Sequence, residues 1–579
     1  MAGSDGGVLP PIILGGYAAK QCAVRTHNDY APLVPAPDWV PSPELQADFD
    51  AGIAFEAEVF AELLLLHPDA VVVDPLLPKA EAIALTVAAM GSAAALILGG
   101  WLPDNTSSGR KGKPDILISV DGGYLPADVK NHKTIKDAKT KANAVSSLAR
   151  PHDMVEVAGL APTSHYYEDG MQLAHYTRML QDLGAHPRGD RLVGAIIGTS
   201  ELDLSGVPRR VLVWHDLAAA VRPTYSRSKG KVKRSLLERY DHEHSFRLMV
   251  ASTAARITGS GDDPRPLVYP IGQEECDQCP YAQWCADQLG PEDASVAITK
   301  GRLDVREWKT LRGLGFSTTS ALAELDPADP EFFESYYPEV THQGRENALK
   351  RLNAAVQQAR MIRDGVDIEP ISDEPIVVPE ADIEIDFDIE WDSAGRIYQW
   401  GLRIRDAQND TTARYAPIVS FEELDDAGEH ALAEQVAALI GQLRAEAEAS
   451  GRTIAVYHWS PVEITMTRKF DCVAAALDGV AVDLLAWLNG TFHVLGGAGI
   501  KHIAPLFGFS WAVDDPGGRL SMEKVSAARA GCHDSLQWCL RYNESDVAAQ
   551  AAIRDGLRQR APEWGPSDAA DVLPDDARP

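Results

Sequence analysis

Two aspartates and a lysine in the first third of the chain have the spacing of a metal-dependent hydrolase. Asp115 lies in a strand-like run, and Asp128-Val-Lys130 follows thirteen residues later. Alternation along a strand puts Asp128 and Lys130 on one face, and two adjacent strands would bring both aspartates to the lysine. Carboxylates can bind one or two Mg²⁺ or Mn²⁺ ions, while a lysine orients water and stabilises charge on phosphate. The pattern predicts phosphodiester hydrolysis.

Three further polar side chains accompany this cluster in the sequence. Glu56 lies on an otherwise apolar helix predicted over residues 52–66, where an unpaired charge is costly unless it faces solvent or a metal. Gln172 and Tyr176 are one turn apart on a helix predicted over residues 171–183, so they share a face. All three are therefore candidate members of one site.

The ordered set resembles the nuclease domain of the RecB and AddB family, a branch of the PD-(D/E)xK nucleases. The resemblance implies that Glu56, Asp115 and Asp128 bind the metal and that Lys130, Gln172 and Tyr176 complete the catalytic site. The family usually has histidine at the position of Glu56, although glutamate is also a metal ligand. A structural ion pair is the alternative role for Lys130.

Three closely spaced cysteines, Cys276, Cys279 and Cys285, can converge on one metal centre, and their spacing alone does not choose between zinc and iron–sulfur. In the iron–sulfur subset of RecB-like nucleases, one cysteine precedes the nuclease core and three follow it. Cys22 is the cysteine that precedes the core here. The resemblance thus implies a structural [4Fe-4S] cluster on these four residues. Zinc is the alternative occupant, and the other alternative is that the four are ordinary buried thiols without a metal. Three others lack ligand spacing and are predicted core residues: Cys472, Cys532 and Cys539.

A second acidic set lies in the last third of the chain. Asp388 and Glu390 alternate on a predicted strand and could share a metal, and four more polar residues follow: Glu463, Asp483, Tyr542 and Asp546. Their order resembles the DEDD exonucleases, specifically the ribonuclease H-like domain of the YprB group. The resemblance implies that Asp388, Glu390 and Asp546 bind metal and that Tyr542 helps to place the attacking water.

The middle motif of this second set departs from the family pattern. Either Glu463 or Asp483 completes the set of catalytic carboxylates. Lys501, after a glycine-rich stretch, is predicted to contact the nucleic-acid backbone. A degenerate domain that only binds nucleic acid is the alternative.

The elements that position these groups predict an α/β protein with four segments. Residues 1–300 would form a restriction-endonuclease-like PD-(D/E)xK domain, with strands near 115–120 and 127–130. Residues 301–370 would form a helical connector, and its glycine turn at 311–315 resembles a helix-hairpin-helix or is a plain turn between packed helices. Residues 380–561 would form the ribonuclease H-like domain, followed by a disordered acidic tail at 562–579.

Composition restricts the possible partners. The 579 residues carry a net charge of −30, which repels nucleic acid, so binding needs metal ions or the basic clusters at 110–141 and 222–234. The alternative is that both clusters are solvated surface loops without a binding role. No secretory signal is visible, and the apolar stretch 82–102 is better explained by a helix, a turn and a strand than by a membrane span. We therefore expect a cytoplasmic protein without a membrane partner.

Together these features predict a metal-dependent DNA nuclease that acts on single strands or ends, in repair, recombination or defence. RNA is the alternative substrate. A helicase or other repair protein is a possible partner and would be a separate chain, because no P-loop occurs in this sequence. Two other functions stay open: catalysis by the ribonuclease H-like domain alone while the first domain binds, or a non-catalytic nucleic-acid scaffold.

Overall fold

A computed structural model describes residues 11–189, 191–204, 206–226, 230–514 and 517–564. The chain divides into two compact units. Unit 1 comprises Met1–Pro291, Asp304–Glu307 and Tyr337–Arg345, and unit 2 comprises Glu292–Leu303, Trp308–Tyr336 and Glu346–Pro579. The division crosses the segment predicted as a helical connector. In the described part of the chain, no helix combines the length and the apolar character needed to span a membrane.

Unit 1 is built on an eight-stranded mixed sheet with the order β1-β2-β5-β6-β9-β10-β7-β8. Strands β5 and β6 are antiparallel and form the predicted pair, with Ile116 opposite Ala127, whereas β6 and β9 are parallel. The strands are β1 Val71–Val72, β2 Leu96–Leu98, β5 Ile116–Val120, β6 Gly123–Val129, β7 Ile135–Ser147, β8 Val155–Pro162, β9 Val193–Asp203 and β10 Pro208–Asp216.

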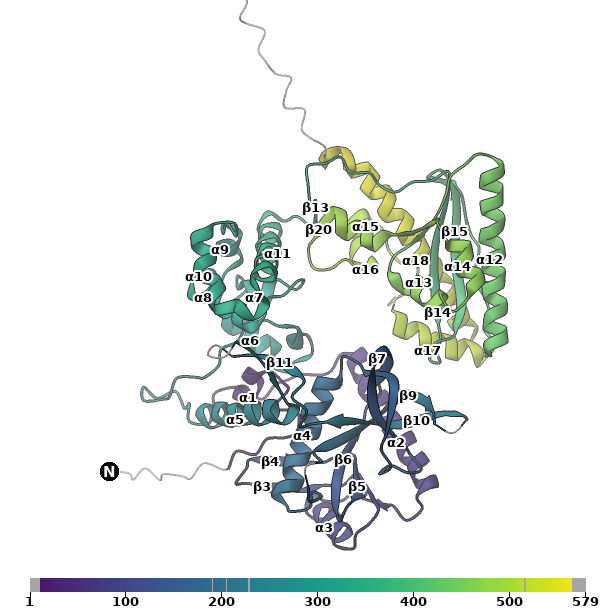
Figure 1. Ribbon diagram of the computed structural model, residues 1–579. Coiled ribbons are helices and arrows are strands. Elements are labelled where there is room, and N and C mark those ends of the chain that lie inside the picture. The colour runs from purple at the N-terminus through teal and green to yellow at the C-terminus, as the bar shows by residue number, and fades with distance from the viewer. Residues whose placement is uncertain (1–10, 190, 205, 227–229, 515–516, 565–579) are drawn as a thin grey trace, which may run out of the picture. The chain divides into compact units, whose positions relative to one another are not determined.

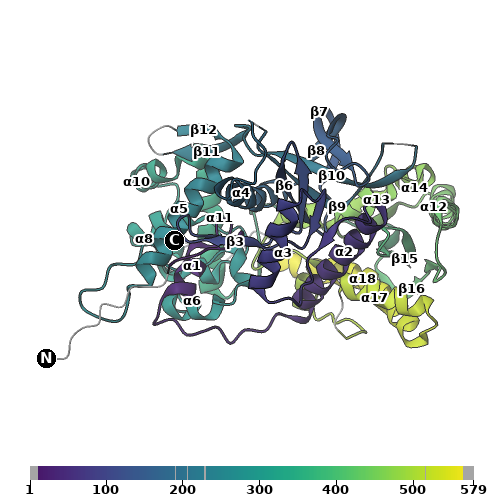
Figure 2. The same cartoon turned by 90° about the horizontal axis from the view of Figure 1, so that it is seen from below.

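Helices α2 (Pro43–Leu66) and α4 (Tyr166–Asp182) cover opposite faces of this sheet (Figures 1 and 2). Apolar residues of α2, among them Val59, pack against the alternate residues of β6 that include Ala127. Helix α2 begins well before residue 52, where the apolar pattern predicted its start. Ser42 accepts a hydrogen bond from the backbone N–H of Leu45, and the proline that follows it suits the first turn.

The remaining elements of unit 1 surround this core. The apolar stretch at 82–102 holds the end of a helix and strand β2, as predicted, and two short hairpins lie outside the main sheet. The elements are α1 Ala23–Tyr30, α3 Lys79–Gly91, α5 Leu236–Ala254, α6 Ala282–Leu289, β3 Leu102–Asn105, β4 Arg110–Gly112, β11 Arg222–Ser226 and β12 Gly230–Arg234.

The helical segment after residue 300 contains the predicted glycine turn. Helix α8 (Val305–Gly313) ends there and the short helix α9 (Thr319–Ala323) follows, with Gly315 at a φ of 94° that favours glycine. Helices α10 (Pro330–Val340) and α11 (Arg345–Asp364) complete the segment.

Unit 2 contains a mixed sheet with the order β16-β15-β14-β18-β19, and β17 also pairs with β15. The strands are β14 Ile383–Trp391, β15 Ile397–Asp406, β16 Asn409–Tyr415, β17 Ile418–Val419, β18 Ile454–His458 and β19 Ala481–Asp483. Helices α12 (Asp426–Ala449) and α18 (His533–Arg560) lie on opposite sides of this sheet (Figures 1 and 2). Because side chains alternate along β14, its apolar residues pack toward α12 and its acidic residues face α18.

The end of unit 2 corrects one prediction. Residues Ala561–Trp564 form a 3₁₀ helix, and the Trp564 ring packs 5.1 Å from that of Phe492. Residues 562–564, which were predicted to belong to a disordered tail, are therefore part of an ordered helix that this aromatic contact holds. Residues 565–579 of that predicted tail lie outside the described part.

Candidate active sites

Three carboxylates of unit 2 meet between β14 and α18. Asp388 and Glu390 alternate along the strand, and Asp546 comes from the helix. One carboxylate oxygen from each lies within 4.8 Å of the others, and Glu390 and Asp546 are buried. Among the described residues, this is the group whose spacing suits a metal ion.

Neutral donors hold each of these carboxylates in place. Asn543 Nδ2 donates to Asp388 at 2.7 Å, and Ser521 Oγ donates to Glu390 at 2.7 Å. Trp511 Nε1 donates to Asp546 at 2.7 Å. Within the described chain, no lysine or arginine forms an ion pair with any of the three carboxylates. The hydrogen bonds therefore orient the oxygens without neutralising their charge.

Burial and mutual repulsion change the acidity of this group. Both effects raise the pKa of Asp388 well above its usual value, with Asp546 as the main neighbouring charge. Burial and the charge of Asp546 likewise raise the pKa of Glu390 to about 8. Burial raises that of Asp546 to about 6, although the bond from Trp511 opposes it. A divalent cation would relieve this repulsion and favour the ionised carboxylates.

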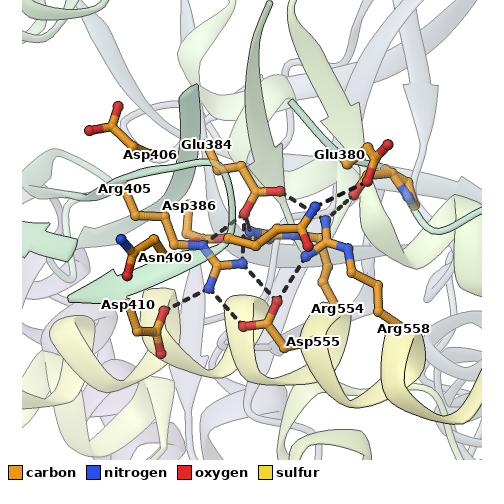
Figure 3. A network of polar contacts seen from close by, with 12 residues as sticks. Glu380, Glu384, Asp386, Arg405, Asp406, Asn409, Asp410, Arg554, Asp555 and Arg558 are labelled. Carbon is orange, nitrogen blue, oxygen red and sulfur yellow. Dashed lines mark hydrogen bonds and ion pairs between the residues drawn. The ribbon is translucent and has the colours of Figure 1, made fainter. Parts of the chain in front are cut away.

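The acidic residues in the first half of β14 have different partners from Asp388 and Glu390. Glu384 and Asp386, which precede Asp388 on the strand, are paired with arginines (Figure 3). Arg405 contacts Glu384 at 2.6 Å, and Arg554 of α18 contacts both acids. Four acids thus line one face of β14, but arginines neutralise the first two and leave the last two for another cation.

The structure separates the two candidates for the middle carboxylate. Glu463 lies in the first turn of α13 (Pro461–Thr467), where it accepts a hydrogen bond from Ser460 Oγ at 2.8 Å, and its charge raises the pKa values of Asp388 and Glu390. Asp483 instead caps α15 (Leu484–Thr491) by accepting from Ala486 N–H at 2.8 Å. Glu463 is thus the nearer partner of the carboxylates, although it is not part of the closely spaced group.

Tyr542 lies one helical turn before Asp546. Lys501 Nζ donates to the Tyr542 hydroxyl at 2.9 Å, and burial together with the charge of Asp546 raises the pKa of this tyrosine. The contact of Lys501 with a nucleic-acid backbone stays a prediction; the lysine is exposed and its Nζ lies on the Tyr542 hydroxyl. Through this bond the ammonium of Lys501 places one positive charge beside the acidic cluster.

Sequence reasoning missed Asn543, although it follows Tyr542 and lies three residues before Asp546 on the same helix face. That spacing was a usable signal. Gly401 lies opposite Asp388 on β15 and makes room for the Asn543 side chain. A Cβ atom at position 401 would lie 1.8 Å from Asn543 Oδ1. Ser521 is distant in sequence from the motifs and had no local signal.

The predicted unit 1 residues also come together. Asp115 immediately precedes β5 and lies opposite Asp128 of β6, whose side chain accepts the Asp115 backbone N–H at 3.4 Å. Lys130 Nζ donates to Asp128 Oδ2 at 2.7 Å, and Asp128 is fully buried. Burial and the charge of Asp128 raise the pKa of Asp115, whereas the charge of Lys130 lowers it.

Glu56 and the α4 pair flank these aspartates. Glu56 is half-buried on α2, and its charge helps to raise the pKa of Asp115. Gln172 Nε2 donates to the Tyr176 hydroxyl at 3.0 Å, and burial and the charge of Asp128 raise the pKa of that tyrosine. Among the described residues, the three predicted metal ligands of unit 1 do not lie within 4.8 Å of one another as those of unit 2 do.

All four predicted cluster cysteines line one cavity of unit 1, beside Arg25 and Glu275. None of them is in a disulfide, and no three of their sulfur atoms lie within 4.8 Å of one another in the described part of the chain. Burial raises the pKa values of Cys22 and Cys279, and raises that of Cys285 to about 11. Of the other cysteines, Cys539 is buried as predicted, Cys472 is half-buried, and Cys532 is exposed, contrary to the prediction, because it lies just before α18 rather than under it.

Parts of the two basic clusters lie on β-ribbons of unit 1. The first includes three exposed lysines on β7, which pairs with β8 along most of its length. The second lies on the β11–β12 hairpin, although Arg227 and Lys229 lie outside the described residues. The exposed lysines of β7 are Lys136, Lys139 and Lys141.

Comparison with known proteins identifies part of unit 2. A family model of the RNase H superfamily matches residues 385–558, which include most of β14 and of α18 and the three closely spaced carboxylates. This segment is therefore an RNase H-like domain within a mixed α/β chain, and such a domain suggests a nuclease-type hydrolase. No curated protein and no solved structure matches the chain.

Proposed function

We propose that this protein is a divalent-metal-dependent nuclease that hydrolyses phosphodiester bonds of DNA, with single strands or ends as substrates. Asp388, Glu390 and Asp546 would hold the metal in unit 2, with Glu463 as the further carboxylate. A bound Mg²⁺ or Mn²⁺ would activate water and neutralise developing charge on the phosphate. Tyr542, held by Lys501, would orient that water.

One observation carries this proposal. Among the described residues, arginines pair with Glu384 and Asp386 on the acidic face of β14, and none pairs with Asp388 or Glu390. Buried carboxylates without a compensating cation are unfavourable, and proteins retain them where a metal or a protonated form is used. The match to the RNase H superfamily across this segment supports the same function.

We further propose that unit 1 is a PD-(D/E)xK nuclease domain related to RecB and AddB. The cross-strand pairing of Asp115 with Asp128, and the bond from Lys130 to Asp128, support this proposal. Lys130 would stabilise charge on the phosphate, and Glu56 would contribute a third carboxylate. Repair, recombination or defence would be the setting, with a helicase or other repair protein as a partner.

The cysteine cavity supports a [4Fe-4S] cluster as the structural cofactor of unit 1. Four thiols around one cavity could bind zinc or an iron–sulfur cluster. The choice of the cluster rests on the resemblance to the iron–sulfur subset of RecB-like nucleases. Anaerobically purified protein should contain about four irons per chain and absorb broadly near 400 nm. Cys22→Ala should lose both, whereas Cys472→Ala should lose neither; colourless protein with one zinc would replace the cluster by zinc.

End-labelled single-stranded DNA, duplex DNA and RNA test the nuclease proposal with Mg²⁺ or Mn²⁺. Asp388→Asn and Lys130→Ala should each remove the products of one site, and the double variant should lose at least about a hundredfold in rate. Glu434→Gln, on the exposed face of α12, is the matched control. EDTA should abolish cleavage. Binding without cleavage of any substrate in both metals would instead indicate a scaffold.

A second candidate function is catalysis by unit 2 alone, with unit 1 binding the substrate. The closer spacing of the unit 2 carboxylates favours it. Full activity in Lys130→Ala together with loss in Asp388→Asn would establish this alternative over a two-site nuclease.

A further inference from the structure

Lys20 lies beside the unit 1 carboxylates, and no sequence motif pointed to it. Its Nζ donates to Gln172 Oε1 at 3.2 Å and approaches the carbonyl oxygen of Glu168 at 3.4 Å. It also lies 4.5 Å from the centre of the Tyr17 ring. Burial and the charge of Lys130 lower the pKa of Lys20 to about 8. A second, half-buried lysine therefore lies close enough to Lys130 for their charges to interact.

The contact with Gln172 determines how that side chain is used. A glutamine amide can present either its oxygen or its amino group to a neighbour. Because the ammonium of Lys20 occupies the oxygen, the amino group faces the Tyr176 hydroxyl, to which it donates at 3.0 Å. Hydrogen bonds from a charged donor are roughly twice as strong as neutral ones, so the lysine favours this orientation.

We propose that Lys20 is a positioning residue of the unit 1 site, which fixes the Gln172 amide and, through it, the Tyr176 hydroxyl toward a substrate phosphate. This inference rests on the nuclease function proposed for unit 1. The cation does not need to touch the substrate, because it acts on the two α4 side chains that face the carboxylates.

The backbone around Lys20 is also tied to the cysteine-lined cavity. Lys20 lies two residues before Cys22, whose backbone N–H donates to the carboxylate of Glu275 at 2.7 and 3.0 Å. Glu275 adjoins Cys276, so the cysteine-rich loop holds the segment that carries Lys20. A metal centre on these cysteines would therefore hold a side chain of the nuclease site in place.

The test uses the full chain with Asp388→Asn, so that unit 2 is silent, and measures kcat and KM on end-labelled single-stranded DNA with Mn²⁺. Lys20→Met should lower kcat by about tenfold to a hundredfold with KM unchanged, the effect of losing a hydrogen bond to a charged group. Lys20→Arg should keep most of the activity. Adding Lys20→Met to Gln172→Met should cause no further loss, because both substitutions remove one interaction.

Four outcomes would overturn this inference. Independent, multiplicative losses in the double variant would show that Lys20 does not act through Gln172. Full activity in Lys20→Met, when Lys130→Ala is inactive, would refute the inference and leave the proposed function standing. Activity that falls together with bound metal or the thermal midpoint would indicate a structural role. Full activity in Lys130→Ala would refute the unit 1 nuclease and this inference with it.

Discussion

In unit 1 the buried Asp128 is paired with Lys130 at 2.7 Å, whereas in unit 2 three carboxylates meet with neutral donors attached. A second lysine, Lys20, adds positive charge to the first site. The first site is therefore closer to electrical balance before any metal binds. The second has the charge of Lys501 beside three carboxylates, so it needs a further cation, or protonation, to offset their repulsion.

Unit 2 contains the same contrast within one strand. The arginine-paired half of β14 joins the strand to α18, and the unpaired half forms the candidate metal site. Placing the two halves side by side lets the arginines fix the register of α18 that brings Asp546 to β14. The carboxylates of the two halves differ in their partners and also in burial, since Glu384 and Asp386 are fully buried and Asp388 is half-buried.

The largest effect is expected from the arginine-paired half. Arg554→Met should destabilise unit 2 by about 3–5 kcal/mol, because the fully buried Asp386 loses its nearest cation and retains Arg403 at 3.5 Å, while Glu384 loses one of its three arginines. Urea unfolding followed by hydrogen exchange of α18 peptides measures this loss. Arg363→Met, at an exposed ion pair, should leave stability nearly unchanged. Equal effects of the two substitutions would contradict a structural role for the buried network.

A divalent cation should stabilise unit 2 more than unit 1. At about a hundred times its dissociation constant, Mn²⁺ should add about 2.7 kcal/mol to the opening free energy of β14. The shift at β5 and β6 should be smaller, because a cation there competes with Lys130 for Asp128. Hydrogen exchange with and without Mn²⁺ compares the strands directly, and Asp546→Asn should remove the β14 shift. Protection of β5 and β6 alone would reverse the assignment.

Acid should weaken unit 1 through a buried histidine. Burial lowers the pKa of His175 to about 3 in the folded unit. Below pH 6.5 this histidine is therefore protonated in the unfolded chain but stays neutral in the folded unit down to about pH 3. Its contribution to stability is complete above pH 6.5 and should fall by about 2 kcal/mol at pH 5. His175→Gln should reduce the pH dependence of α4 exchange, whereas substitution of the exposed His152 should not. An unchanged dependence in His175→Gln would show that other groups control it.

The sequence predicted much of what local pattern determines. Alternation along strands placed Asp128 with Lys130 and Asp388 with Glu390, and the match to the RNase H superfamily confirms a ribonuclease H-like domain. Helix starts were less predictable, because the start of α2 depends on a cap and a proline rather than on apolar periodicity.

The partners of the site residues were harder to predict, because they are distant in sequence. Ser521, which donates to Glu390, and Lys20, which donates to Gln172, carry no motif and become visible only in three dimensions. The sequence left Glu463 and Asp483 as alternatives, and only the fold shows how their contacts differ, with Asp483 capping α15. Local spacing thus predicts the acids better than the groups that orient them.

Replacing one aspartate by asparagine in each site should have the smallest effect on stability. It should also separate the two sites most sharply. Without metal, Asp388→Asn should stabilise unit 2 by about 1 kcal/mol, because it removes a charge repelled by Asp546 and Glu390 and keeps an oxygen for Asn543. Asp128→Asn should destabilise unit 1 by at least as much, since Lys130 loses its partner while it stays buried.

Opposite signs in EDTA, measured by urea unfolding with hydrogen exchange of β6 and β14, are the expected result. Mn²⁺ should then cancel the advantage of Asp388→Asn, because the amide is a poorer ligand than the carboxylate it replaces. The same sign at both positions would mean that the two sites balance their charge alike. In that case the arginine-free half of β14 would have no special need for a cation.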